Sequence, residues 1–147
     1  MTFPRLYLVR PSFNRTRVED IPGTVRREIL EKDLLANVTS GQTVAVPVGS
    51  RGIANIEVIT RAICETIRDH DGVPVIVPAM GSHGGGTPEG QRSILEGYGV
   101  TEEFCGAEIR SSVETVIVEQ TPLGFPVHFD RAAHGCDHVL IVGRVKA

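Results

Sequence analysis

Apolar residues recur along this chain at two spacings, one typical of strands and one typical of helices. Two short runs of mainly β-branched residues, 43–48 and 73–77, predict strands that are buried on both faces. Each run is followed by a loop and then by apolar residues three and four positions apart, which predicts a helix. These helices are expected over 55–68 and 91–98. The first carries an isoleucine stripe made of Ile56, Ile59, Ile63 and Ile67.

The order of strand, loop and helix, repeated once, favours a parallel sheet with right-handed crossovers. We therefore expect a single α/β domain over 1–147, with a mostly parallel sheet in a Rossmann-like three-layer arrangement. Before these elements, a short strand is expected over 5–10, ended by Pro11. A helix should follow, with Pro22 in its first turn and Asp20 as its cap. Its apolar stripe consists of Val25, Ile29, Leu30 and Leu34.

The chain changes character in its last third. A short helix is expected over 101–105, and the alternating residues of 113–119 predict a strand. A turn at 122–124 joins this strand to a second one at 127–129. The two strands should therefore pair as a small antiparallel hairpin.

The end of the chain combines a predicted strand with a group of possible metal ligands. Asp130 and Arg131 are expected to start a short helix with their charges toward solvent. The apolar run 139–142 predicts a further buried parallel strand. Before it lies a compact group whose members would share one face of an extended strand: His134, Cys136 and His138. Their spacing is no recognised metal motif, so a structural role is preferred and no metal site is predicted.

Composition and charge exclude several classes of protein. The chain has 147 residues, of which 41% are hydrophobic and 22% charged, as in globular domains. Its net charge of −3 gives no general attraction to nucleic acid or acidic lipid, and no apolar run is long enough for a membrane span. The first residues lack the apolar core of a signal peptide. Three cysteines without a CxxC pair indicate reduced thiols and a cytoplasmic protein.

The loops after the two central strands hold the residues most suited to chemistry. The second loop, 78–89, is rich in glycine and contains His83, which can exchange protons near neutral pH. The first loop contains Arg51 between Gly49 and Gly52, where a guanidinium can bind a carboxylate or phosphate. The carboxyl ends of neighbouring parallel strands share one edge, so both loops should meet there. With the N-terminus of the following helix, they predict a site for an anionic small molecule.

Other interpretations of these residues stay open. His83 could be a turn histidine bonded to local backbone, and Arg51 a solvated surface arginine. Ser50 and Thr87 suit helix caps or turns better than nucleophiles, since the chain contains no GxSxG elbow. The glycines fit neither GxGxxG nor the phosphate-loop pattern with its lysine, so a nucleotide site is not favoured.

Five pieces of the chain have a distinctive order and spacing. They are Val48-Gly49-Ser50-Arg51, the helix 55–68, Ala79-Met80-Gly81-Ser82-His83, Thr87-Pro88-Glu89 and 136–146. Together they resemble the N-terminal domain of the nickel-dependent lactate racemase family, which includes other 2-hydroxy-acid racemases and epimerases. The resemblance spans about residues 40–147.

The resemblance implies roles for particular residues. His83 corresponds to one of two acid/base histidines, and Arg51 to the arginine that binds the substrate carboxylate. The implied chemistry moves a hydride from the α-carbon of a 2-hydroxy acid to a nickel-pincer nucleotide and returns it to either face. The histidines would handle the hydroxyl proton, which suits a general base placed near it. The expected substrate-binding residues are Arg51, Ser50, Gly81, Ser82 and Thr87.

The chain also departs from the family pattern. Val48 stands where the family has an acidic residue, Gly52 where it has proline, and Gly84 and Gly85 where it has arginine and proline. These differences indicate a divergent branch. The family's second histidine, its cofactor-bearing lysine and its nickel ligands correspond to positions after Ala147. Activity is therefore expected to need a C-terminal domain or a partner chain.

Three functions compete at this point. The first is a part of a 2-hydroxy-acid racemase or epimerase that is inactive alone. The second is a stand-alone module that binds an anionic carboxylate metabolite without chemistry, and the third is a structural domain that assembles with another chain. An open edge of the parallel sheet would also favour a homo-oligomer.

Overall fold

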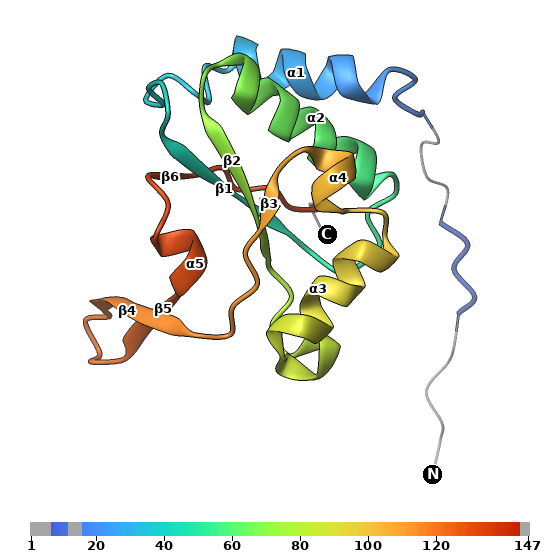
Figure 1. Cartoon of the computed structure of the whole chain (residues 1–147). Coiled ribbons are helices and arrows are strands. Elements are labelled where there is room, and N and C mark those ends of the chain that lie inside the picture. The colour runs from blue at the N-terminus through green and yellow to red at the C-terminus, as the bar shows by residue number, and fades with distance from the viewer. Residues whose placement is uncertain (1–6, 12–15, 145–147) are drawn as a thin grey trace.

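The protein, described by a computed structural model over residues 7–11 and 16–144, is built around a parallel sheet (Figure 1). This sheet has the order β3-β2-β1-β6, and all neighbouring strands in it run parallel. A second sheet consists of the antiparallel pair β4 and β5. The strands are β1 (Thr43–Val48), β2 (Val73–Pro78), β3 (Glu108–Ile109), β4 (Thr115–Gln120), β5 (Pro126–Asp130) and β6 (His138–Val139). The predicted α/β class, with a mostly parallel sheet and a small antiparallel hairpin, is confirmed.

The helices follow the predicted order along the chain. They are α1 (Ile21–Glu31), α2 (Ile56–Asp69), the 3-10 turn η1 (His83–Gly86), α3 (Pro88–Gly97), α4 (Glu102–Cys105) and α5 (Arg131–His134). The start of α1 is as expected, because Pro22 lies in its first turn and the Asp20 carboxylate accepts a hydrogen bond from the N–H of Gly23. The isoleucine stripe of α2 is also confirmed, since Ile56, Ile63 and Ile67 are buried.

The sheet separates two apolar layers because alternate residues of a strand point to opposite faces. Val44, Val46 and Val48 of β1 pack into the larger cluster, to which α1, α2, α3 and α4 also contribute. The opposite face carries a smaller cluster in which Ala45 and residues of β2 pack with Ala133 of α5. Figure 1 shows α1 and α2 on one side of the sheet and α5 away from them. The loops that follow β1 and β2 emerge at the carboxyl edge of the sheet.

Proline cuts the ladder between β1 and β6 short. The N–H of Leu140 donates to the carbonyl of Ala45, so the odd-numbered residues of β1 direct their backbone polar groups toward β6. Pro47 is the next such residue, and it has no N–H to continue the ladder. Of the run 139–142, which was predicted as a buried parallel strand, only Val139 belongs to a strand, and Val139 and Ile141 are both exposed, so the prediction of a buried strand is wrong.

Prolines act in the same way on the other side of the sheet. The N–H groups of Val73 and Ala79 donate to the carbonyls of Gln42 and Val48, at the two ends of β1. Because successive residues of a strand direct their backbone polar groups to alternate sides, those of Pro74 and Pro78 face β3 instead. Neither can donate to β3, which pairs only between them. Nothing in the alternation of apolar residues predicted this two-residue strand.

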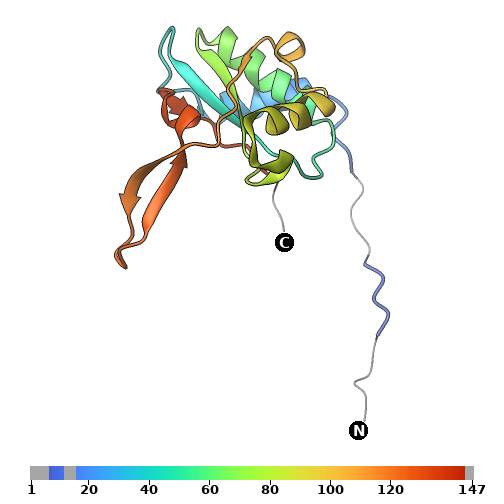
Figure 2. The ribbon, with the colours of Figure 1, turned by 60° about the horizontal axis from the view of Figure 1, so that its bottom comes forward.

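The hairpin of β4 and β5 extends away from the body of the molecule, as Figure 2 shows. Its strands pair with each other, with an irregularity between Ile117 and Glu119, and the hairpin packs mainly against α5. The Asp130 carboxylate caps α5 by accepting from the N–H of Ala133. Arg131 forms an ion pair with Glu114 at 2.9 Å, which corrects the expectation that its charge only meets solvent.

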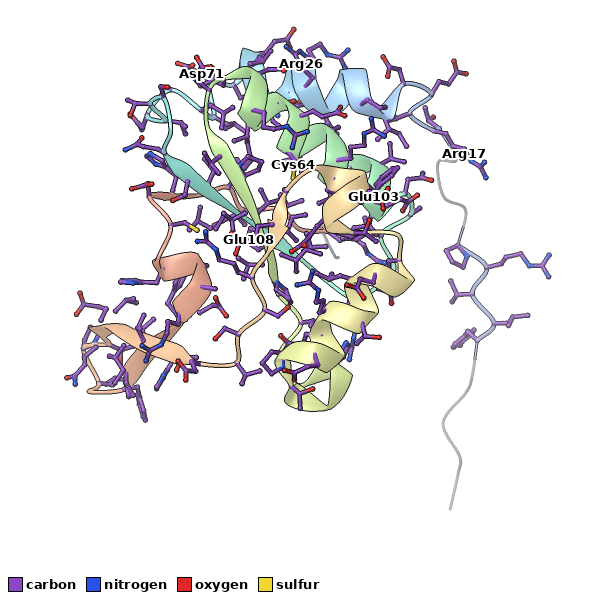
Figure 3. All side chains as sticks on the ribbon, viewed as in Figure 1. Arg17, Arg26, Cys64, Asp71, Glu103 and Glu108 are labelled. Carbon is purple, nitrogen blue, oxygen red and sulfur yellow. The ribbon has the colours of Figure 1, made fainter. Side chains whose placement is uncertain are left out.

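Two further expectations differ from the structure. The strand expected over 5–10 is not formed by residues 7–10, and its first two residues lie outside the described part of the chain. Leu30 is exposed because α1 turns its Val25 and Ile29 side toward the core, and Leu34 is exposed in the turn that follows the end of α1 at Glu31. Cys64, a buried residue of α2 labelled in Figure 3, and the other two cysteines are free, as expected. Within residues 7–11 and 16–144, no helix has the length and apolar character needed to cross a membrane.

Candidate functional site

The two loops predicted to carry chemistry meet at the carboxyl edge of the sheet. Residues 49–52 follow β1, and residues 79–82 follow β2, which lies beside β1 in the ladder. His83 Nδ1 lies 2.6 Å from the hydroxyl of Ser50, and its Nε2 lies 2.8 Å from a guanidinium nitrogen of Arg51. The structure thus brings the predicted acid/base and carboxylate-binding residues into direct contact.

The contact with Arg51 fixes the protonation of the His83 ring. A guanidinium can only donate hydrogen bonds, so Nε2 must accept from Arg51 with its lone pair. The neutral ring then carries its proton on Nδ1, which donates to the Ser50 oxygen. The Ser50 hydroxyl hydrogen is left free to donate elsewhere. In this arrangement the Nε2 lone pair of His83 is occupied by the Arg51 guanidinium.

Two residues of α3 and its C-terminal end hold these loops in place. The hydroxyl of Tyr98, just after the helix, donates to the backbone carbonyl of Ser50 at 2.8 Å. The side-chain amide of Gln91 donates to the backbone carbonyl of Gly81 at 2.7 Å. Gln91 is only 4% exposed, and its Oε1 has no hydrogen-bond partner in the described protein. Sequence reasoning missed both residues, because their contacts depend on how α3 returns over the loops.

The glycines of the second loop allow close backbone packing. Gly84 has φ +66°, and a Cβ added there would overlap the backbone of Gly90 in the first turn of α3. Thr87 caps α3, accepting from the N–H of Gly90 at 3.1 Å and donating to the carbonyl of Gly84. Thr87 was expected to bind substrate, but its hydroxyl is engaged in this cap.

The two loops and residues 142–144 line a cavity of about 550 Å³ that is open to the surface. Of the residues predicted to bind substrate, Ser50, Arg51, Gly81 and Ser82 line it together with His83, whereas Thr87 does not. The residues that line it include two arginines and no acidic side chain, so its charge favours an anion.

Arg144 is the second cation at this cavity, and it was not predicted as a site residue. Its guanidinium donates to the carbonyl of Gly52 at 2.9 Å, which ties the two walls of the cavity together. Like Arg51, it follows a strand of the parallel sheet at the carboxyl edge. That position was the available signal, because loops at this edge commonly carry ligand-binding residues.

An apolar cavity of about 210 Å³ adjoins the polar one and shares Ile53 and residues 142–144 with it. The side chains that form its wall come from β1, α2 and the segment after β6. They include Val46, Val48, Ile56, Ile59, Ile63 and Val142. A ligand with an anionic head and a short aliphatic tail would match both cavities.

The histidine–cysteine group near the end of the chain is divided among three elements. His134 ends α5, Cys136 follows in a turn, and His138 begins β6, where its Nε2 lies 2.8 Å from the side-chain oxygen of Gln42. They therefore do not share one face of a strand. Among the described residues, no group of three or more His, Cys, Asp or Glu side chains is arranged to hold a metal ion.

Burial makes two of the thiols poor nucleophiles. It raises the pKa of Cys64 to about 12 and also raises the pKa of Cys105. No protein-family model matches this chain, and neither curated proteins nor solved structures give a significant match.

Proposed function

We propose that the cavity binds a small anionic 2-hydroxy acid as the substrate-binding part of a racemase or epimerase. Arg51 would bind the carboxylate, and His83 would accept the proton of the 2-hydroxyl group. The observation that carries this proposal is the contact between the His83 ring and the Arg51 guanidinium at the lining of one cavity.

The hydrogen bonds explain how binding and proton transfer would be linked. A carboxylate offers the Arg51 guanidinium a stronger, charge-assisted acceptor than the neutral His83 ring does. Once Arg51 turns toward the carboxylate, Nε2 of His83 loses its donor and has a free lone pair. A hydroxyl on the adjacent carbon would then lie close enough to donate to Nε2. Ser50, bonded to Nδ1, would keep the ring oriented.

The described residues do not fit a nickel-pincer nucleotide by themselves. The cavity is lined by one histidine and by no cysteine or lysine, so it offers neither an amine for covalent attachment nor a set of soft metal ligands. No step is therefore assigned to that group. Isomerase activity, a cytoplasmic location and a C-terminal domain or partner chain that completes the site are further parts of the proposal.

A second function, binding without chemistry, is favoured by one specific observation. His83 is the only acid/base side chain besides the arginines among the described residues that line the cavity. Inversion at a carbon requires groups on both of its faces, and this cavity supplies one. A stand-alone carboxylate-binding module would need no second group.

Calorimetric titration of the chain with lactate enantiomers and with propionate, which lacks the hydroxyl, tests the proposal. Arg51→Ala should weaken binding of both acids by about tenfold to a hundredfold, because a charge-assisted pair is lost. His83→Ala should abolish the preference for lactate over propionate. Arg27→Ala, a change on the exposed side of α1, is the matched control and should bind as the unaltered chain does.

The outcomes separate the candidate functions. Equal affinity for lactate and propionate in the unaltered chain would favour the carboxylate-binding module. Affinity that is unchanged by Arg51→Ala would refute binding at this cavity. Exchange of configuration, measured by chiral chromatography after adding a candidate C-terminal domain, is the direct test of isomerase activity.

A further inference from the structure

Two segments on opposite sides of the molecule expose apolar side chains in the part of the chain that the structure describes. The first is the extended segment 7–11, in which Tyr7 is 79% exposed, Leu8 96% and Val9 78%. It forms no hydrogen bond to any other described residue. The second is the hairpin of β4 and β5. Figures 1 and 2 both show the segment and the hairpin on opposite sides of the body, so the two do not meet within one copy.

The hairpin has the features of a strand acceptor. It is an isolated two-stranded sheet, so each strand has an edge of unpaired N–H and C=O groups. A two-stranded hairpin alone is only marginally stable in water. Its exposed large hydrophobic residues are Ile117, Val118, Leu123, Phe125, Val127 and Phe129. A third strand would satisfy one edge and cover part of this apolar surface.

The charges of the two segments are complementary. Residues 1–18 include four arginines and no acidic residue, and Arg10 and Arg17 lie in their described part. Residues 113–130 include Glu114, Glu119 and Asp130 and no lysine or arginine; Arg131, the next residue, pairs with Glu114, so the hairpin stays acidic through Glu119 and Asp130. Two hairpins would therefore repel each other, whereas the basic segment is attracted to the acidic hairpin. This complementarity identifies the occupant of the hairpin edge.

We propose that the chain forms a two-fold dimer in which residues 7–10 of each copy add as a third strand to the hairpin of the other, with Arg10 beside Glu119. The β4 edge is the acceptor, because β4 contains Glu119 and no proline, while β5 begins with Pro126 and lacks one N–H. Pro11 ends the added strand. The edges of the parallel sheet are poorer acceptors because β3 and β6 have only two residues each.

Reversing one charge on each side gives a decisive test. In a dimer of Arg10→Glu chains, both junctions place the introduced carboxylate near Glu119. In a dimer of Glu119→Arg chains, both place the introduced guanidinium near Arg10. Each variant should dimerise at least about tenfold more weakly than the unaltered chain at low salt. In an equimolar mixture, one junction of the mixed dimer pairs the two introduced charges and the other is unaltered. Mixing should therefore restore dimerisation.

Sedimentation velocity over a range of concentrations provides the measurement, and circular dichroism shows that each variant is folded. Both substituted side chains are exposed. Arg27→Glu on α1 and Glu103→Arg on α4 are matched controls at exposed positions, and the latter is labelled in Figure 3. They should dimerise as the unaltered chain does. About 1 M salt should weaken the unaltered dimer.

Each alternative result has a definite meaning. A chain that stays monomeric at its highest soluble concentration overturns the proposal. Dimerisation that neither substitution weakens, or that the controls weaken equally, shows that the interface lies elsewhere or depends on net charge alone. A mixture that fails to restore the dimer excludes this pairing of segment and hairpin. The test does not depend on ligand binding at the His83 cavity.

Discussion

Replacing Gln91 by methionine should leave the protein as stable as before or slightly more stable, although a hydrogen bond is lost. Methionine keeps the length and approximate volume of glutamine. The lost bond from the Gln91 amide to the Gly81 carbonyl contributes about 0.5–1.5 kcal/mol. Gly81 is exposed, so water can replace the amide at that carbonyl.

The opposing effect comes from the other end of the same side chain. The buried Oε1 of Gln91 has no partner among the described residues, and such an acceptor costs about 1–3 kcal/mol. Removing it should outweigh the lost bond, for a net stabilisation of about 1 kcal/mol. The loop of Gly81 should meanwhile become looser, because its link to α3 is gone.

Urea denaturation, with fitted midpoints and slopes, measures the change in the free energy of unfolding. Gln120→Met, at an exposed position on the hairpin, is the matched control and should change stability little. Hydrogen exchange at the amide of His83, which donates weakly to the Met80 carbonyl at 3.3 Å, should be faster in Gln91→Met. A destabilisation of more than about 1 kcal/mol would refute the reasoning, since the polar group would then be net favourable.

Two further predictions concern the second loop and the start of β6. Gly84→Ala should lower the free energy of unfolding, measured by urea denaturation, by more than about 1 kcal/mol, because the positive φ of Gly84 and its contact with Gly90 both disfavour a Cβ. Gly124→Ala is the control: Gly124 also has a positive φ but open space around it, so this change should destabilise the protein less. The N–H and hydroxyl of Thr43 donate to the Asp137 carboxylate and hold its pKa below the usual value of 3.8. The stability that these hydrogen bonds contribute is therefore present above pH 3.8 and is lost as the pH falls through the lower pKa of the folded state. Thermal melts of Asp137→Asn should show less loss of stability in this acid range than the unaltered chain, and identical profiles would contradict the assignment.

The elements that the sequence predicted well are those in which local pattern and tertiary packing agree. The continuous apolar runs of β1 and β2 meet a core cluster on each face of the sheet, and the isoleucine stripe of α2 faces the larger of these clusters. The outer strands were predicted poorly, because their lengths depend on a neighbour's hydrogen-bonding capacity. Pro47 ends the pairing of β6, and Pro74 and Pro78 limit that of β3. An apolar run in the sequence does not indicate whether the neighbouring strand has a backbone N–H free to hydrogen-bond with it.

The candidate site shows the same division. The meeting of Arg51 and His83 followed from two parallel strands whose loops share one edge, which sequence order alone can predict. The contributions of Tyr98 and Gln91 could not be predicted, because each reaches a loop far from it in sequence through the packing angle of α3. Thr87 was correctly seen as a possible cap, and the structure places it there.

The proline in β1 has a consequence for the cavity beside it. Because Pro47 offers no hydrogen, the backbone after Leu140 leaves the sheet and becomes the wall of the cavity instead. That wall is tied to the opposite loop by the hydrogen bond from Arg144 to Gly52. Opening it would break that hydrogen bond and uncover Leu140 and Val142, which pack against the main core cluster. The cavity thus has one wall held by paired strands and one held by a side-chain hydrogen bond and two partly buried apolar side chains.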